Sequence, residues 1–513
     1  MTALAAHTAR PALGKALPPA APDDAEKLSY LSRSLPYLTV ALLISAGCIV
    51  TTQVFFELRN PVALPFAAYT LTYLCYQAVS LPVNFTGRGF DARAHQALAA
   101  GWRPARYPAV DIFLPICGEP IEVLINTWAG VHQLIQAYPG RSSAYVLDDG
   151  PSEQARRTAP HYGFWYVRRP RLRYHKKAGN LNYAFARTSS EFVVVFDADF
   201  RPRPDFLAQL LPYLDDPAVG IVQSPQFFRV SPRQTWVERA AGASLEVFYR
   251  VVQGARDRYG SALCVGTNAI YRRAALAREG GFTLIPYAED SHTGLDARYH
   301  GYQLRYVPLA LAAGICPASL GSFMRQQYRW CCGATSLIWT RHMWRVAMPL
   351  RSRLPYLAGW LWNLVTGLRT LVLPLFPVTI LAFTPGTVEL RNTILLLPVV
   401  LNAVVLYPLW HNCRYPPGMW PLGIAVGWAQ VLALWDFLRG AVMSWEATQG
   451  PAGAPARFRK AVALWNGSLA LAWLGLSGWR ISQHPSARFA CIGLLGVIYA
   501  AVISRVVFPG PAA

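Results

Sequence analysis

The sequence predicts an α/β domain inserted into an α-helical membrane region with about six transmembrane helices. Two observations support this fold class. Of the 513 residues, 53% are hydrophobic and only 15% are charged, whereas a soluble domain carries about 25% charged residues. Apolar stretches near the roughly 20 residues that cross a bilayer lie towards both ends of the chain, and residues 105–340 between them have the composition of a soluble α/β domain.

The membrane helices are expected in three pairs. Residues 36–84 contain the first pair, 357–411 the second and 461–508 the third. Arginines and lysines flank the first pair on both sides. The positive-inside bias therefore places both flanks in the cytoplasm, at the plasma (inner) membrane. Residues 1–35 are rich in Ala and Pro, and we expect them to form a disordered cytoplasmic tail.

The apolar stretch at 421–445 is ambiguous because it contains Asp436 and Arg439. A seventh span here would move the basic cluster at 457–460 outside, against the charge bias. An interfacial helix followed by a loop, together covering 415–460, keeps that cluster in the cytoplasm and leaves six spans. A shorter interfacial helix is expected at 341–356.

The net charge of +21 comes mainly from arginine. Nucleic acid, anionic lipid or a phosphate-bearing substrate would each explain such a charge. No nucleic-acid-binding motif is present, and basic residues gather next to the apolar spans, which favours membrane lipid and a phosphate-bearing substrate. The nine cysteines show no disulfide or metal spacing, as expected in a reducing compartment.

Short apolar runs within the central domain, at 100–340, predict buried parallel strands at 110–114, 144–147 and 192–196. Each run leads into a loop with acidic residues, and ligands bind at the carboxyl ends of strands in open α/β sheets. Asp197 and Asp199 follow the third run directly. Two carboxylates at that position suit Mg²⁺ or Mn²⁺ bridging to phosphate oxygens, although Asp199 alternatively caps a following helix.

Two further segments carry charges suited to a diphosphate. Asp148 and Asp149 precede Gly150, a pattern that also makes ordinary turns. The segment HKKAGN at 175–180 offers cations and a flexible backbone to phosphate groups, or is an exposed basic loop.

A third set of residues suits an acceptor sugar. Glu289 and Asp290 offer a general base for an attacking hydroxyl. The indole of Trp330 can stack on a sugar ring, and the guanidinium of Arg329 can hold phosphate oxygens with two parallel hydrogen bonds. With Gln326 they form a QxxRW pattern, but each residue alone would also suit an interfacial helix.

The ordered series DDG, HKKAGN, DAD, ED and QxxRW resembles the processive family-two glycosyltransferases, specifically the cellulose synthase and bacterial β-glucan synthase group. The resemblance covers about residues 110–450 and includes the placing of the spans. It implies an α/β cytoplasmic GT-A (Rossmann-like) glycosyltransferase domain inserted in a multi-span α-helical membrane domain.

The resemblance also implies roles for individual residues. The catalytic base is Asp290. The implied donor-binding residues are Glu119, Asp148, Asp149, Lys177, Asp197 and Arg329; the acceptor-binding residues are Gln326, Trp330 and Glu289; the metal ligands, for Mg²⁺ or Mn²⁺, are Asp197 and Asp199. Segment 264–268 resembles the acceptor-facing loop of the family.

The sequence departs from the family pattern in three places. Ala288 stands where the family usually has Thr, which leaves the neighbouring acids intact. Segment 445–450 resembles the gating loop that closes over the donor, but it is one residue short and lacks the usual Lys. We also expect no PilZ domain, through which bacterial cellulose synthases sense cyclic-di-GMP.

The reaction implied is that of a processive, inverting hexosyltransferase that polymerises a β-glucan from UDP-glucose and passes it through its own membrane channel. Its expected partners are the UDP-sugar donor, the growing β-glucan, membrane lipid and accessory export proteins, and no nucleic acid. Two related alternatives are a non-processive lipid glycosyltransferase and a synthase that uses another UDP-sugar, such as UDP-N-acetylglucosamine. A transporter with a nucleotide-binding domain is disfavoured because no Walker-type loop is present.

An arginine and several tryptophans inside the predicted spans are candidates for lining the expected channel. Arg369 lies inside the third span, where a charge usually faces a polar path or snorkels to the interface. The tryptophans either line a sugar channel or form an interfacial aromatic belt; those in question are Trp360, Trp362, Trp410, Trp465 and Trp479.

Overall fold

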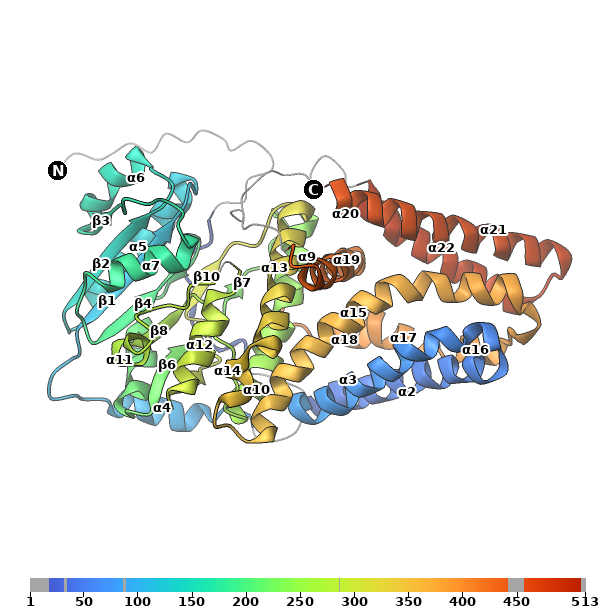
Figure 1. Cartoon of the computed structure of the whole chain (residues 1–513), viewed down its shortest axis with the longest axis horizontal. Helices are drawn as coiled ribbons and strands as arrows, with labels where there is room; N and C mark the ends of the chain where they lie inside the picture. Colours follow the sequence, from blue (N-terminus) through green and yellow to red (C-terminus); the bar gives the residue numbers. More distant parts are fainter. Residues whose placement is uncertain (1–17, 32–34, 86–88, 286, 442–455, 509–513) are drawn as a thin grey trace.

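The protein consists of an α/β domain at one end and a group of long helices that extend from it (Figure 1). The computed structural model describes residues 18–31, 35–85, 89–285, 287–441 and 456–508. Segment 445–450, which resembles the gating loop of the family, lies outside these residues.

The α/β domain is built on a seven-stranded mixed sheet in the order β3-β2-β1-β4-β8-β6-β9. Strands β1 to β4 are parallel to one another, β8 is antiparallel to both of its neighbours, and β6 pairs in parallel with β9. The strands are β1 (Val110–Ile116), β2 (Ser142–Asp148), β3 (Trp165–Val167), β4 (Phe192–Val195), β6 (Val219–Gln223), β8 (Ala269–Arg272) and β9 (Gln303–Tyr306). The three predicted strands are therefore confirmed as β1, β2 and β4.

Helices cover both faces of this sheet, as the strand sequences require. Alternate side chains of a strand point to opposite faces. In β1, Ile112 packs in one core with Trp128 of α5 (Ile121–Ala137), whereas Phe113 packs in the other with Leu181 of α7 (Lys176–Phe185). All four side chains are at most 2% exposed, and each such burial contributes about 1.5–3 kcal/mol.

A small second sheet joins the α/β domain to the helical region. It has the order β5-β10-β7, formed by β5 (Arg201–Pro202), β10 (Ala312–Gly314) and β7 (Phe227–Phe228). The remaining helices of this domain are α4 (Ala92–Gly101), α6 (Glu153–Thr158), α8 (Phe206–Leu210), α9 (Trp236–Val247), α10 (Gly254–Arg258), α11 (Arg273–Ala277), α12 (Glu289–Tyr299), α13 (Leu320–Trp339) and α14 (Arg341–Arg345). Helices α9, α10 and α13 lie on the side that faces the long helices (Figure 1).

Seven helical stretches in the described part of the chain are long and apolar enough to cross a membrane. They are Tyr37–Arg59 in α2, Pro61–Asn84 in η1 and α3, Leu350–Phe383 (α15), Leu390–Trp410 (α16 to α18), Met419–Leu438 (α19), Ala456–Gln483 (α20, η7 and α21) and Ala487–Val507 (α22). The predicted helical membrane region is thus confirmed.

Helix α19 differs from the other six in its direction. It is seen end-on in Figure 1, where α15, α21 and α22 run along the long axis of the molecule. It packs against both α13 and α15, and half of its most apolar window is buried inside the protein. Its buried acidic residue, Asp436, accepts a hydrogen bond from the Tyr328 hydroxyl at 2.7 Å and pairs with Arg457 at 2.6 Å.

Two boundaries differ from the sequence prediction. The expected interfacial helix at 341–356 is wrong as one element: α14 ends at Arg345, and α15 begins at Leu350 and continues without a break to Phe383. The join is broken because the backbone is extended at Val346, φ −56° and ψ 130°, and again at Pro349, φ −65° and ψ 155°; a proline also disfavours the helical conformation of the residue before it.

Disorder over the whole of 1–35 is also wrong for the described part of that segment. Helix α1 (Asp24–Leu28) docks on the α/β domain. Glu26 accepts two hydrogen bonds from the Arg229 guanidinium, both at 2.6 Å, and Lys27 pairs with Asp205 at 2.6 Å. Tyr30 is only 4% exposed. Composition signals disorder when a segment lacks apolar residues, whereas this segment is held by charge pairs and one buried aromatic.

Candidate active site

The acidic loops that follow β1, β2 and β4 meet at one edge of the sheet because these strands are parallel and adjacent. Asp148 is the last residue of β2 and is fully buried. Its carboxylate accepts hydrogen bonds from the Gly150 and Ser152 amides, at 2.6 and 2.7 Å, and from the Tyr166 hydroxyl at 2.6 Å. Asp148 thus stabilises the turn that follows β2, and it does not line the cavity described below.

Asp149 is held by an arginine that the sequence prediction missed. The Arg169 guanidinium donates to both carboxylate oxygens of Asp149, at 2.6 and 2.5 Å, and both side chains are 5% exposed. This is the two-pronged pairing that fixes orientation as well as charge. The short strand β3 brings Arg169 to the same edge; its three residues, WYV, are only partly buried and were not predicted as a strand.

The basic segment 173–180 consists of a tight turn at 173–175 and the beginning of α7, so most of the HKKAGN motif is helical and is not an exposed loop. Arg173, His175 and Lys176 all have left-handed backbones, with φ of 59°, 50° and 49°. Such residues cost about 1 kcal/mol or more each and persist only when neighbours hold them. Arg169 supplies this support by donating to the carbonyls of Tyr174 and Lys176, at 2.5 and 3.1 Å.

Lys177 joins the basic loop to the DAD segment. Its ammonium donates to Asp197 Oδ1 at 2.5 Å and to the Gly266 carbonyl at 2.9 Å. Burial works against the charged ammonium, but the carboxylates of Asp197 and Glu289 outweigh it, so the pKa of Lys177 lies above its ordinary value. The lysine is a fixed positive charge at the sheet edge.

Asp199 lies in a concentration of negative charge. Burial and the carboxylate of Asp197 raise the pKa of Asp199 to about 8. Glu119, whose Oε2 accepts the Cys117 amide at 2.6 Å, adds to this charge, and burial raises the pKa of Glu119 as well. The protein itself therefore supplies too little positive charge to balance the carboxylates of Asp197 and Asp199.

Asp290 stands at the start of α12, where it touches the acceptor-loop segment. Burial and the neighbouring Glu289 raise the pKa of Asp290 to about 7, against the attraction of Lys177. Oδ1 accepts the Ser291 amide at 2.7 Å. A Cβ on Gly266, whose φ is +73°, would lie 2.9 Å from Asp290 Oδ2. Only glycine permits this approach, so the loop brings its backbone directly onto the carboxyl.

Helix α13 carries the QxxRW residues past the two acids. Burial lowers the pKa of Arg329, while Glu289 and Asp290 oppose that effect. Trp330 is 40% exposed, and the buried Oε1 of Gln326 accepts no hydrogen bond from the described residues. A Cβ on Gly333 would lie 2.6 Å from the Cβ of Ala288. The helix therefore packs closely against the position where the family usually has Thr.

These residues line one continuous cavity of about 1780 Å³ that extends from the sheet edge into the long helices. Of the residues assigned from the sequence, all but Asp148 line it: Glu119, Asp149, Lys177, Asp197, Asp199, Glu289, Asp290, Gln326, Arg329 and Trp330. Its far part is lined by residues of the membrane helices, including Tyr76, Arg369, Tyr407, Trp473 and Tyr499.

Of the five tryptophans singled out from the sequence, only Trp362 lines the cavity. Trp465 instead donates its indole N–H to the Leu371 carbonyl at 3.1 Å, which ties η7 (Val462–Gly467) to α15. Trp420 and Trp473, which the prediction missed, also line the cavity. The sequence does not show how each helix is rotated about its axis. Residue spacing alone therefore could not separate the tryptophans that line the cavity from those that do not.

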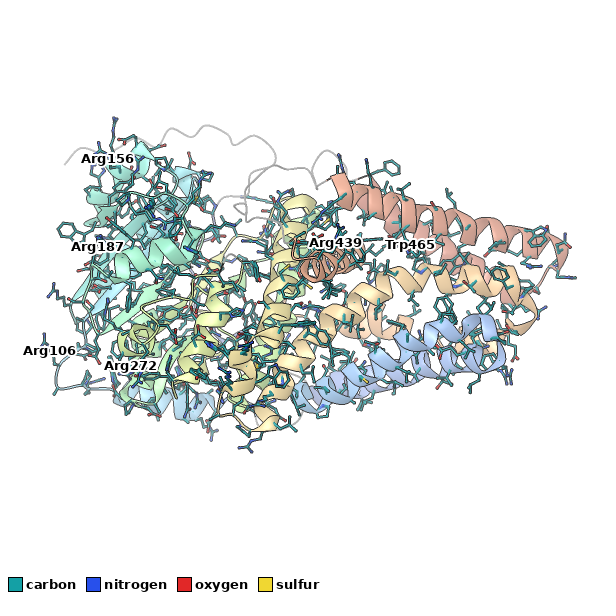
Figure 2. All side chains as sticks on the ribbon, viewed as in Figure 1. Arg106, Arg156, Arg187, Arg272, Arg439 and Trp465 are labelled. Atoms are coloured by element: carbon teal, nitrogen blue, oxygen red, sulfur yellow. The ribbon has the colours of Figure 1, made fainter. Side chains whose placement is uncertain are left out.

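Basic residues are also placed away from the membrane helices. Arg106, Arg156, Arg187 and Arg272 lie on the part of the α/β domain remote from those helices (Figure 2). From the sequence, the basic residues were expected next to the apolar spans. The structure shows that positive charge is also present on the side of the α/β domain away from the membrane helices.

A second group of metal-type ligands lies outside the cavity. Glu246, His411 and Cys413 place their ligand atoms within 4.8 Å of one another. Donors already occupy the carboxylate, since Glu246 accepts from Arg250 at 2.8 Å and from the Asn412 amide at 2.9 Å. These contacts tie α9 to the segment after α18; both donors reach Oε1 of Glu246, and Oε2 lies 3.2 Å from His411 Nδ1.

Comparison with known proteins finds similarity over part of the chain. The model of Glycosyl transferase family group 2 matches residues 192–407. The cellulose synthase catalytic subunit of Pseudomonas fluorescens is 33% identical over 242 residues, 46% of this chain and 32% of the relative. The cellulose synthase 1 catalytic subunit of Komagataeibacter xylinus is 30% identical over 332 residues, 64% of this chain and 43% of the relative. The chain thus spans less than half the length of these two relatives.

Solved structures give weaker similarity. A mannosyltransferase from Pyrobaculum calidifontis, in complex with GDP-Man and Mn²⁺, aligns with a TM-score of 0.47 and 21% identity, over 70% of this chain and 99% of the other. Glucosyl-3-phosphoglycerate synthase from Mycobacterium tuberculosis aligns with a TM-score of 0.32 and 20% identity, over 52% and 87%. The chain is therefore similar to the family-two glycosyltransferases over residues 192–407 and to cellulose synthase catalytic subunits over part of its length, and its mixed-sheet α/β domain is joined to a helical region.

Proposed function

We propose that the protein polymerises a β-glucan from UDP-glucose and passes the growing chain into its own membrane helices. One observation carries this proposal. The charged pocket at the sheet edge and the aromatic-lined space among the membrane helices are one cavity of about 1780 Å³. An enzyme that transferred a single sugar to a lipid would have no use for a continuous path of this kind.

The donor diphosphate is proposed to lie against Asp149, Lys177 and the loop that Arg169 fixes. Lys177 and Arg329 line the same cavity and would offset the charge that develops on the leaving group. Glu119, in the loop after β1, is proposed to lie beside the nucleotide. Trp330 offers its exposed ring for stacking on the acceptor sugar, and Gln326 directs an unpaired amide oxygen into the site.

The charges at the strand end fit a divalent cation. The raised pKa of Asp199 reflects its burial and, after that, repulsion from Asp197; among the described residues only Lys177 forms an ion pair with these two acids, at 2.5 Å from Asp197. Asp197 and Asp199 would hold Mg²⁺ or Mn²⁺, which binds carboxylate oxygens and supplies charge neutralisation for a diphosphate.

Asp290 is the proposed general base. Its Oδ2 accepts no hydrogen bond from the described residues, while Oδ1 is held by the Ser291 amide. The carboxylate would take the proton of an acceptor hydroxyl, whose oxygen attacks the anomeric carbon as the bond to the diphosphate breaks on the opposite side. A single displacement of this kind converts an α-linked donor into a β-linked product.

The proposed topology has six spans, with α19 as an interfacial helix and the α/β domain in the cytoplasm at the inner membrane. The end-on direction of α19 relative to α15 supports this arrangement (Figure 1). It also keeps the basic residues at 457–460 on the cytoplasmic side.

Purified protein in lipid, given a panel of UDP-sugars with metal, tests the proposal. The expected product is a long unbranched polymer from UDP-glucose that linkage-specific glucanases digest. Transfer of only one or two sugars to lipid would overturn the processive step. Polymer from UDP-N-acetylglucosamine alone would overturn the donor, and no UDP release with any donor would favour a transporter.

A further inference from the structure

The membrane part of the cavity contains an unusual charge. Among the described residues that line the cavity from the membrane helices and the turns joining them, only Arg369 and Glu389 are charged. Glu389 lies next to α16 and is neutralised by Arg59 at 3.1 Å and by Arg391 at 2.5 Å. The remaining charge in this part of the cavity is the guanidinium of Arg369.

Arg369 has no hydrogen-bond or ion-pair partner among the described residues. It lies on α15, which packs against α3 on one side and α19 on the other. Its Nη2 lies 3.9 Å from the position that a Cβ on Gly423 of α19 would occupy. Tyr69 and Tyr76 of α3, which also line the cavity, are within electrostatic reach of it.

An unpaired arginine inside a membrane protein must face water or another polar path, because its charge is too costly to expose to hydrocarbon. Arginine keeps its proton at any ordinary pH, so the positive potential in the cavity is permanent. A guanidinium repels sodium ions and hydronium but can donate hydrogen bonds to the hydroxyls of a neutral sugar. Its charge therefore discriminates between ions and a neutral glycan.

A water-filled path from the active site into the membrane helices would leak protons whenever no glycan filled it. We propose that Arg369 is an electrostatic barrier that excludes cations from the empty conduit and so protects the ion gradients of the membrane. Fixed positive charges exclude protons and cations from other membrane pores in the same manner. The inference rests on the proposed conduit but not on the transfer reaction.

The size of the effect follows from Coulomb's law. A monovalent cation about 5 Å from the guanidinium is repelled by an amount that depends on the effective dielectric constant, between about 80 in water and about 20 near protein. These limits correspond to roughly 4-fold and roughly 300-fold lower cation entry. Removing the charge should therefore raise proton and sodium flux by a factor within that range, and reversing it should raise the flux further.

A charge series in proteoliposomes tests this inference without any donor sugar. The variants are Arg369→Lys, Arg369→Gln and Arg369→Glu, and Arg505→Gln serves as a control because Arg505 is an exposed residue of α22 that does not line the cavity. Proton flux is followed with an internal pH dye and chloride flux with an internal quenched dye, at fixed membrane potential. UDP release by the wild type, measured separately, tests the proposed function.

We expect the Lys variant and the control to match the wild type. The Gln variant should leak cations at least about 4-fold faster, and the Glu variant faster still, with chloride flux falling in the same order. Equal proton flux in the wild type and the Gln and Glu variants, including no flux in any of them, would overturn the inference. Parallel rises in proton and chloride flux would overturn it as well, since they would indicate a disrupted bundle instead of a lost charge.

Discussion

Replacing Asp290 with asparagine should abolish sugar transfer and at the same time stabilise the protein. The structure gives the reason for both effects. Burial and Glu289 raise the pKa of Asp290 from 3.8 to about 7, so the ionised carboxylate that the reaction needs is disfavoured by its surroundings. At about 1.4 kcal/mol per pKa unit, this corresponds to a destabilisation of at most about 4 kcal/mol when the group is ionised.

The sign of the pH dependence follows from linkage. The folded carboxyl holds its proton more tightly than the unfolded one, so this group lowers the stability of the wild type as the pH rises from about 4 to about 7. Above about pH 7 the full penalty is present. Asparagine does not titrate, and the Tm of Asp290→Asn should therefore exceed that of the wild type most clearly at about pH 8.

The effect on the reaction rate should be large, and Asp290→Asn should lose activity although it gains stability. Loss of a general base costs about 10²–10⁴-fold in rate. In the wild type, kcat/KM should rise about tenfold per pH unit below about pH 7 and then level off. Incorporation of labelled sugar is the assay, with thermal unfolding in detergent measured in parallel.

A matched control is Asp257→Asn on α10. Burial also raises the pKa of Asp257, but this residue does not line the cavity. The control should keep normal transfer. Transfer by Asp290→Asn at more than a tenth of the wild-type rate, or a pH profile that stays flat between about 5.5 and 8, would refute the assignment of the base.

Three further predictions follow from the same site and from the topology. Excess EDTA should abolish transfer and Mg²⁺ or Mn²⁺ restore it, because Asp197 and Asp199 need a cation; full activity in EDTA would show that these acids have another role. Gly266→Ala should lower kcat at least tenfold, since its Cβ would lie 2.9 Å from Asp290 Oδ2 in a left-handed backbone; unchanged kcat would show that the loop does not need this close approach. Ala454→Cys should resist an impermeant thiol reagent added to intact cells, relative to the parent protein; labelling from outside would restore the seventh span.

Local sequence determined much of the α/β domain. Strands β1, β2 and β4 were predictable because their apolar runs are buried on both faces, which leaves a signal in composition alone. The acids at their ends could be placed together because parallel neighbouring strands end at one edge. The same reasoning failed for β3, whose three residues are partly exposed, and so Arg169 was missed.

Long-range contacts decided the details of the site. Lys177 is held by the carbonyl of a residue 89 positions away, and Gly266 presses against Asp290 from a different loop. Asp148, which the motif assigned to the donor, is occupied entirely by its own turn and by Tyr166. Such assignments depend on which way a side chain points after folding, and a motif records only the order of residues.

In the membrane region, too, the sequence determined some features and the tertiary structure decided others. Length and hydropathy by themselves determined where helices long enough to span a bilayer occur, because the bilayer imposes a length that is written in consecutive residues. They also placed a charge, Arg369, inside the third span. Only the tertiary structure showed that α19 runs across the other helices, that Trp362 and not Trp465 lines the cavity, and that Arg369 lines that cavity with no hydrogen-bond or ion-pair partner among the described residues. The reason is that the rotation of a helix about its axis is set by its packing against other helices, and this information is distributed over segments far apart in the chain.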